Sequence, residues 1–115
     1  MSEDTIFHKI IRKEIPADIV FESESLIAIR DTNPVAPVHI LVIPKKTFPC
    51  LRKAQKGDAA LLGHMLEVCA KIAKQENIEE EGYRVVINAG PNAGQAVDQL
   101  HFHIIGGRKM SWPPG

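Results

Sequence analysis

Two histidines separated by a single residue lie near the C-terminus of the chain, within the stretch that covers residues 99–108. Two sets of residues alternate strictly along it: apolar Leu100, Phe102 and Ile104, and between them Gln99, His101, His103 and Ile105. Strict alternation predicts a half-buried strand, with both imidazoles and the Gln99 amide on one face. Residues two apart on a strand lie roughly 6.5–7 Å apart along its axis, so the two imidazoles can share one small anion or one metal ion. The plainer interpretation is a pair of solvent-facing histidines.

A turn-rich loop over residues 88–95 precedes the histidines and contains Gly90 and Gly94. Glycine allows the main chain to point N–H groups at an anion such as a phosphate. Nucleophilic attack on phosphorus needs a neutral imidazole, N–H donors for the anion and a partner that sets the tautomer of the ring. All three are within local reach, so the pattern favours phosphate chemistry at one of the two histidines.

Zinc is the alternative ligand, but Zn²⁺ normally takes at least three protein ligands. The third would have to be His39, His8 or His64. The last two fall in predicted helices, where we expect them at the surface. His39 begins an apolar strand, so it is either a buried, hydrogen-bonded histidine or a support for the other two. We therefore expect neither a metal ion nor a cofactor.

Two helices are predicted from the hydrophobic pattern. The short one covers residues 6–13, with Asp4 or Thr5 as its N-cap. Its apolar side consists of Phe7, Ile10 and Ile11. The long one covers residues 58–75, with Asp58 as its N-cap. Its apolar positions recur at helical spacing: Leu61, Leu62, Met65, Leu66, Cys69, Ile72 and Ala73.

Five strands complete the pattern. They cover residues 19–22, 26–30, 39–44, 83–88 and the histidine stretch, 99–108. The first two are separated by a polar turn and predict a hairpin, and the nearly continuous apolar run of the third predicts a central place in the sheet. The predicted fold class is therefore α+β, with a mainly antiparallel sheet of five strands and two main helices.

The composition excludes several classes of partner. Fourteen Lys and Arg balance fourteen Asp and Glu, so no net charge favours a nucleic acid or a membrane surface. The N-terminus lacks the pattern of a signal peptide and no apolar run reaches membrane-spanning length, which predicts a cytoplasmic protein. A chain of 115 residues, 44% of them hydrophobic, predicts one domain over residues 1–115. Cys50 and Cys69 lack the spacing of a disulfide framework or a zinc site.

Motifs along nearly the whole chain resemble those of one family, the histidine triad (HIT) nucleotide-binding proteins, and specifically its Hint branch. The matching segments, in order, are DTIF at 4–7, KIIRKEIP at 9–16, APVHILVIPKK at 36–46, GYRVVIN at 82–88, GQ at 94–95, HFH at 101–103, GGR at 106–108 and WPPG at 112–115. So many matches in one order are highly specific. The resemblance implies a homodimer whose sheets join across the interface, and a pocket for a purine nucleotide or nucleoside phosphoramidate.

The resemblance also implies roles for individual residues. His101 matches the nucleophile that attacks the α-phosphate, forming a nucleotidyl-histidine that water hydrolyses, and His103 matches the histidine that contacts the phosphate and assists the leaving group. Gln99 and His39 complete the expected catalytic set. The expected nucleotide contacts are Asp31 at the ribose, Phe7, Ile10 and Leu41 around the base, Asn88, Gly94, Gln95 and Ala96 at the phosphate, Thr32 elsewhere in the nucleotide site, and Trp112 reaching toward the partner's site.

The chain departs from the family pattern at two of these positions. Gln99 stands where the motif begins with histidine, and Ala96 stands where the Hint branch usually has a serine hydroxyl. We expect both replacements to lie at the phosphate. Because the nucleophile position is intact, the predicted function is a purine nucleoside phosphoramidase. The alternatives are a non-catalytic nucleotide-binding regulatory protein and, third, a zinc-binding protein.

Overall fold

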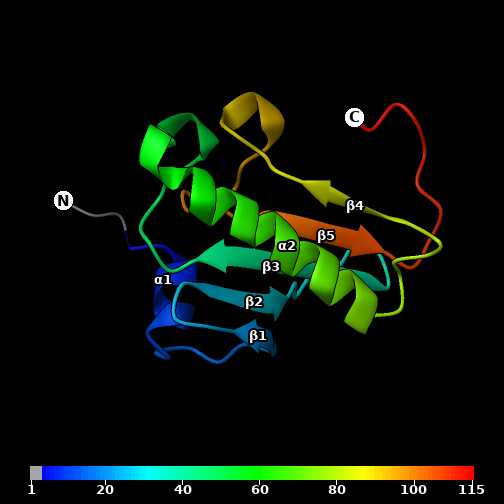
Figure 1. The fold of residues 1–115 in the computed structure, drawn as a ribbon, viewed down its shortest axis with the longest axis horizontal. Helices are drawn as coiled ribbons and strands as arrows, with labels where there is room; N and C mark the ends of the chain where they lie inside the picture. The colour runs from blue at the N-terminus through cyan, green and yellow to red at the C-terminus, as the bar shows by residue number, and fades with distance from the viewer. Residues whose placement is uncertain (1–3) are drawn as a thin grey trace.

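A five-stranded antiparallel sheet forms the centre of the protein, in a computed structural model that describes residues 4–115 (Figure 1). The strands are β1 Ile19–Glu22, β2 Leu26–Arg30, β3 Val38–Pro44, β4 Tyr83–Val86 and β5 Phe102–Gly106, in the order β1-β2-β3-β5-β4. Every neighbouring pair is antiparallel. The predicted fold class is confirmed, as is the central place of β3.

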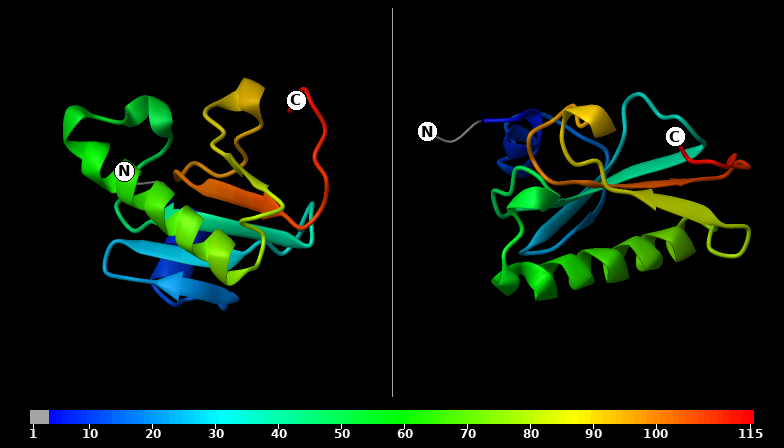
Figure 2. Two further views of the ribbon diagram at one scale, coloured as in Figure 1. Left: turned by 45° about the vertical axis from the view of Figure 1, so that its right-hand side comes forward. Right: turned by 90° about the horizontal axis from the view of Figure 1, so that it is seen from above.

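Two helices pack on opposite faces of this sheet (Figure 2). They are α1 Ile6–Ile11 and α2 Ala59–Gln75; short 3-10 helices occur at Leu51–Lys53, Lys56–Asp58 and Pro91–Ala93. Successive side chains of a strand point to opposite faces, so β3 presents Ile40 and Val42 to α2 and Leu41 and Ile43 to α1. None of the helices within residues 4–115 is both long and apolar enough to cross a membrane.

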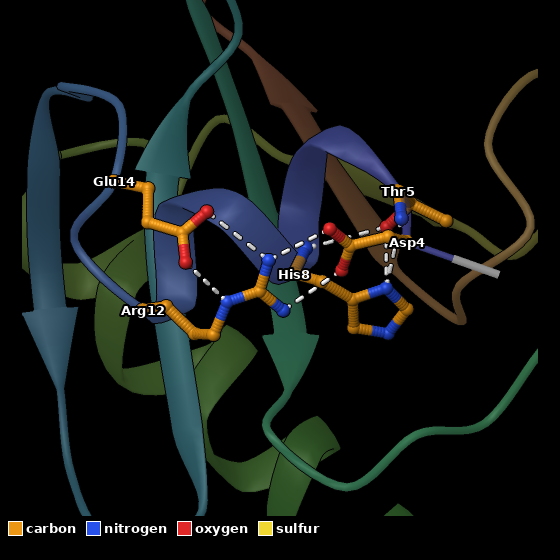
Figure 3. A network of polar contacts seen from close by, with 5 residues as sticks. All are labelled: Asp4, Thr5, His8, Arg12 and Glu14. Carbon is orange, nitrogen blue, oxygen red and sulfur yellow. Dashed lines mark hydrogen bonds and ion pairs between the residues drawn. The ribbon is translucent and has the colours of Figure 1, made fainter. Parts of the chain in front are cut away.

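The start of α1 is held by a reciprocal cap, shown in Figure 3. Thr5 is the N-cap, and its hydroxyl accepts from the main-chain N–H of His8. The His8 Nδ1 in turn accepts from the Thr5 N–H, 3.0 Å away. Our prediction that His8 lies at the surface was wrong, because this cap turns its ring inward and buries it. His64, on α2, is half exposed as predicted.

The long helix begins where the sequence placed it, but its N-cap residue acts elsewhere. The Asp58 side chain makes no cap to α2 and instead accepts from the Gln55 N–H and from Lys46. The prediction that Leu66 belongs to the apolar side of this helix was also wrong, since Leu66 is 51% exposed and Val68 is buried instead. Met65 and Ile72 lie fully buried against the sheet, as the helical spacing predicted.

Candidate active site

Three histidines meet on the face of the sheet that carries α1. His103 in β5 pairs with Leu41 in β3, and His39 lies two residues before Leu41, so the two imidazoles share a face. The His39 Nε2 lies 3.0 Å from the His103 Nδ1, and the ring centres of His101 and His103 are 4.9 Å apart. The sequence predicted the neighbouring pair, and the structure adds His39, for which two interpretations had stayed open.

The tautomer of His101 is set by a main-chain carbonyl. The ring precedes β5, is 7% exposed, and places its Nδ1 2.7 Å from the Gln99 oxygen. A carbonyl only accepts hydrogen bonds, so Nδ1 carries the proton and Nε2 keeps its lone pair. Burial lowers the pKa of His101, outweighing the Gln99 oxygen and Asp31, which favour the charged form. The ring is therefore neutral near pH 7, as a nucleophile requires, and Phe7 packs edge-on against it.

A second chain of hydrogen bonds sets the tautomers of His39 and His103. The Val35 N–H donates to the His39 Nδ1 over 3.1 Å, which leaves the His39 proton on Nε2. That N–H donates to the His103 Nδ1, so the His103 proton is on Nε2. Within residues 4–115 this buried Nε2 has no hydrogen-bond partner. Burial, followed by the nearby His101 and His39, lowers the pKa of His103 to about 4. The result is a neutral ring with one N–H available to a ligand.

Asp31 faces the histidines from the end of β2. One carboxylate oxygen lies 3.4 Å from the His39 Nε2, and the other accepts from the Asn33 N–H at 2.8 Å. The second contact is the turn-capping role that an Asp-Thr-Asn-Pro sequence favours. The same carboxylate borders a cavity of about 390 Å³, so it combines a structural contact with access to a ligand.

This cavity is largely apolar. Ile6, Ile10, Ile15, Ile29, Asp31 and Thr32 are among the residues that line it. Three of them, Ile10, Asp31 and Thr32, were expected to contact a nucleotide. Phe7 and Leu41, which we also expect around the base, pack with Ile10 in the core beneath α1. We did not predict Ile6, Ile15 and Ile29 at this cavity, because in the sequence an apolar residue that lines a cavity looks the same as one in the core.

The loop before the histidines is braced from within. Gly94 adopts φ 79°, a left-handed conformation that glycine takes without strain. The Gln95 side chain accepts from the Gly90 N–H and donates to the oxygens of Pro49 and Val97. Both amide N–H groups of Gln95 are therefore engaged in holding the loop, and the contact of this residue with a phosphate stays a prediction. Asn88 lies half-buried after β4, and Ala96 is exposed in the loop.

Gln99 does not lie where the alternating pattern placed it. Its side chain is fully buried, accepts from the Phe48 N–H at 2.9 Å, and donates to the oxygens of Pro44 and Lys46. All its polar atoms therefore join the segment after β3 to the segment before β5. The expectation of Gln99 on the imidazole face, at the phosphate, was wrong because β5 begins only at Phe102 and strand alternation does not reach back to residue 99.

The C-terminal tail leaves Trp112 82% exposed. Arg84 in β4 donates to the main-chain oxygen of Ser111, which holds the tail beside the sheet edge (Figure 1). The contact of Trp112 with a partner's site stays a prediction.

Asp31, His39 and His103 together offer three ligand atoms within 4.8 Å of one another, a donor set that zinc accepts in principle. The hydrogen bond on the far side of His39 does not fit a metal. A metal-bound histidine normally donates its second N–H to a carbonyl, a carboxylate or water. Here the second nitrogen of His39 accepts from the Val35 N–H, so its Nε2 is protonated and has no lone pair for a metal.

Comparisons with known proteins agree with this arrangement. A model of the HIT domain matches residues 12–110. An uncharacterized HIT-like protein of Synechococcus elongatus is 58% identical, with all of both chains covered. A 14 kDa zinc-binding protein of Zea mays is 52% identical over 96% of this chain and 88% of its own, although the residues around His39 here do not fit a zinc ion.

Two solved structures share the fold closely. A HIT family hydrolase from Legionella pneumophila superposes with a TM-score of 0.94 at 44% identity, covering 96% of this chain and 98% of its own. A histidine triad nucleotide-binding protein from Candida albicans superposes with a TM-score of 0.80 at 32% identity, covering 95% and 82%. The family model and these relatives together show that the chain belongs to the HIT domain family.

Proposed function

We propose that this protein is a nucleotide hydrolase of the Hint branch that cleaves the P–N bond of purine nucleoside phosphoramidates through His101. The single observation that carries the proposal is the protonation pattern of two adjacent rings. His101 is neutral with its lone pair on Nε2, and His103 beside it holds a buried N–H that no protein group accepts within residues 4–115. A nucleophile and an adjacent donor are what attack on an anionic phosphorus requires.

In the first half of the reaction, the His101 Nε2 forms a bond to the α-phosphorus while the bond from phosphorus to the amine breaks. The electron pair leaves with the amine nitrogen, which takes a proton from solvent. His103 is neutral and donates from Nε2, so it stabilises charge on the reacting group without losing its own proton. The product is a nucleotidyl-histidine and the free amine.

In the second half, water attacks the same phosphorus. Its oxygen forms the new bond, its proton passes to solvent, and the electron pair of the P–N bond returns to the His101 Nε2. The Gln99 carbonyl accepts from the His101 Nδ1 throughout and stabilises the positive charge that the ring carries in the intermediate. The nucleoside monophosphate then leaves a neutral His101.

The apolar cavity beside Asp31 suits a nucleoside. Ile6, Ile10 and Ile29 provide apolar walls for a flat base, and the Asp31 carboxylate can accept from two ribose hydroxyls. Asp31→Ala should therefore weaken AMP much more than inorganic phosphate in calorimetric titration, because phosphate has no ribose hydroxyls. Equal weakening of both ligands would assign Asp31 to the turn with Asn33 alone.

A homodimer belongs to the same proposal. Strand β4 lies at an edge of the sheet, where its outer main-chain groups can pair with a second copy, and Leu66 exposes apolar surface on α2. Such a dimer would bring the exposed Trp112 of one chain toward the site of the other. Sedimentation should give a dimer at micromolar concentration, and Leu66→Asp should shift it toward monomer. A monomeric wild type at that concentration would remove this part of the proposal.

The enzyme is tested by multiple-turnover kinetics on an AMP–amine conjugate. We expect AMP and amine to appear in equal amounts over many cycles. The rival function is a nucleotide-binding regulatory module. It is supported by Ala96, because this residue lacks the hydroxyl of the serine that the Hint branch usually has in the loop before His101. A wild type that binds AMP but releases no amine, and that stays inactive as Ala96→Ser, would favour that rival.

A further inference from the structure

The segment that follows β5 holds the loop between β2 and β3. The Arg108 Nε donates to the Val35 oxygen over 2.9 Å, a contact that spans 73 residues of sequence. Beside it, a Cβ built on Gly107 would lie 3.0 Å from the Cβ of Pro37, so the main chain of Gly107 packs directly on that proline. Two consecutive residues thus hold one loop, just beyond the last β3–β5 pair, Val38 with Gly106.

Apart from these contacts, the loop they hold is anchored by Ala36, which is buried. Residues 34–37 belong to no helix or strand, and Val35 itself is 55% exposed, so its side chain is not anchored in the core. Yet the Val35 N–H is the donor that reaches the His39 Nδ1. This main-chain donor occupies the His39 Nδ1, and the Asp31 carboxylate lies beside Nε2, so the two contacts together favour the proton on Nε2.

We propose that Arg108 is a positioning residue, which sets the tautomers of His39 and His103 by holding Val35. It touches neither ring. Its bond to the Val35 oxygen keeps the N–H of the same residue directed at the His39 Nδ1. That contact keeps the His103 proton on Nε2, the buried nitrogen that has no partner within residues 4–115. The structural part of this inference stands without any turnover, and only its catalytic consequence rests on the proposed function.

Loss of the Arg108 bond has a definite consequence for the protons. When the Val35 N–H moves away, the His39 Nδ1 is free to carry the proton, while Asp31 still favours a proton on Nε2, so both tautomers are populated. In the new tautomer Nε2 is an acceptor. The bond between His39 and His103 then forms only if the His103 Nδ1 donates, which removes the proton from the His103 Nε2. His103 would face the substrate with a lone pair, where an anionic phosphate needs a donor.

Two substitutions isolate this hydrogen bond from the charge of Arg108. In Arg108→Gln the amide nitrogen occupies the place of Nε along the chain, so an N–H donor to Val35 is retained while the charge is lost. In Arg108→Met both the donor and the charge are lost, at similar length. Because Arg108 is exposed, neither change disturbs the core. The two variants therefore differ in the proposed contact alone.

The tautomers are read without substrate, in long-range ¹H–¹⁵N correlation spectra of histidine-labelled protein, with His39 assigned by its absence in His39→Asn. We expect the wild type and Arg108→Gln to show His39 protonated on Nε2, and Arg108→Met to show a mixture. Turnover of an AMP–amine conjugate should fall about two- to tenfold in kcat for Arg108→Met, the loss expected for one exposed hydrogen bond, with KM little changed.

An unchanged His39 tautomer in Arg108→Met would overturn the proposal, whatever its activity. Equal mixing in both variants would also overturn it, since it would assign the effect to charge. If the tautomer shifts as expected but the wild type turns over no phosphoramidate, the positioning role stands and the proposed function fails.

Discussion

The two faces of the sheet have opposite characters. The face under α2 is an apolar core in which Ile40, Val42, Phe102 and Ile104 pack against the long helix. The face under α1 has a smaller apolar cluster, and beside it lie His39, His101 and His103. Alternate residues of the same two strands, β3 and β5, supply both faces, so adjacent side chains in the sequence serve stability on one side and chemistry on the other.

The difference follows from the lengths of the two helices. Helix α2 has 17 residues and runs along the sheet, whereas α1 has six and covers only part of its face (Figure 2). Beside the short helix lies the cavity that Ile6, Ile10 and Asp31 line, while Phe7 of the same helix packs against His101. Substitutions on the two faces should therefore separate loss of stability from loss of activity.

The largest effect is expected on the α1 face. His101→Ala removes the attacking nitrogen, and turnover of an AMP–amine conjugate should fall by about 10⁴-fold or more, as for other covalent nucleophiles. The free energy of unfolding and the affinity for AMP should change little. His64→Ala, at an exposed position on α2, is the control and should leave kcat unchanged. Normal turnover by His101→Ala would remove the covalent mechanism.

On the α2 face the expected effect is on stability. Met65 is fully buried between α2 and the sheet, so Met65→Ala should lower the free energy of unfolding by about 2–5 kcal/mol, from lost apolar burial and the cavity left behind. Denaturant titration measures this change. At temperatures well below the melting point kcat/KM should stay near the wild-type value. Glu67→Ala, an exposed change on the same helix, should be nearly neutral. A specific loss of kcat in Met65→Ala would break the division between the faces.

Gln99 contributes to both stability and activity, so its substitution tests how far these two properties can be separated. Gln99→Leu leaves the Phe48 N–H and the oxygens of Pro44 and Lys46 without their partner, at a cost of about 1–3 kcal/mol for a buried group left unpaired. It should also lower kcat, because loss of these side-chain bonds lets the segment shift, and the main-chain carbonyl of Gln99 that positions His101 shifts with it. Gln99→His, with one donor and one acceptor, should be intermediate in stability. A more active Gln99→His would instead support the first expectation, that this side chain acts at the phosphate.

The smallest expected effect is a change with pH. Burial lowers the pKa of His101 below its ordinary value of about 6.5, so kcat/KM should be level near neutral pH and fall as the pH drops through that lowered pKa, where the nucleophile becomes protonated. His103, with a pKa of about 4, binds a proton less readily folded than unfolded. The contribution of His103 to the free energy of unfolding should therefore be fully present above pH 6.5 and should be lost as the pH falls toward 4.

These two slopes are measured by a pH–rate profile and by denaturant titration at several pH values. His103→Asn removes the second titration and should flatten the stability slope. A kcat/KM that rises on acidification would contradict a neutral His101.

The elements were largely predictable from the sequence because their signals are local. The continuous apolar run of β3 and the helical spacing of Met65, Cys69 and Ile72 can be seen in short segments of the sequence, and both elements formed where they were expected. Boundaries were less predictable. The histidine strand was expected from residue 99 and begins at Phe102, because pairing with Val42 is what starts it.

The candidate site shows the same division. The sequence by itself determined that His101 and His103 would be neighbours and that the chain carries the HIT motifs, since these depend on residue type and spacing. Only the tertiary structure decided that Gln99 turns into the core, that Val35 sets the tautomer of His39, and that Arg108 reaches Val35. The physical reason is that each of these is a hydrogen bond involving a single main-chain group in an irregular segment. The periodic pattern of side chains along a sequence does not predict where such a main-chain group will point.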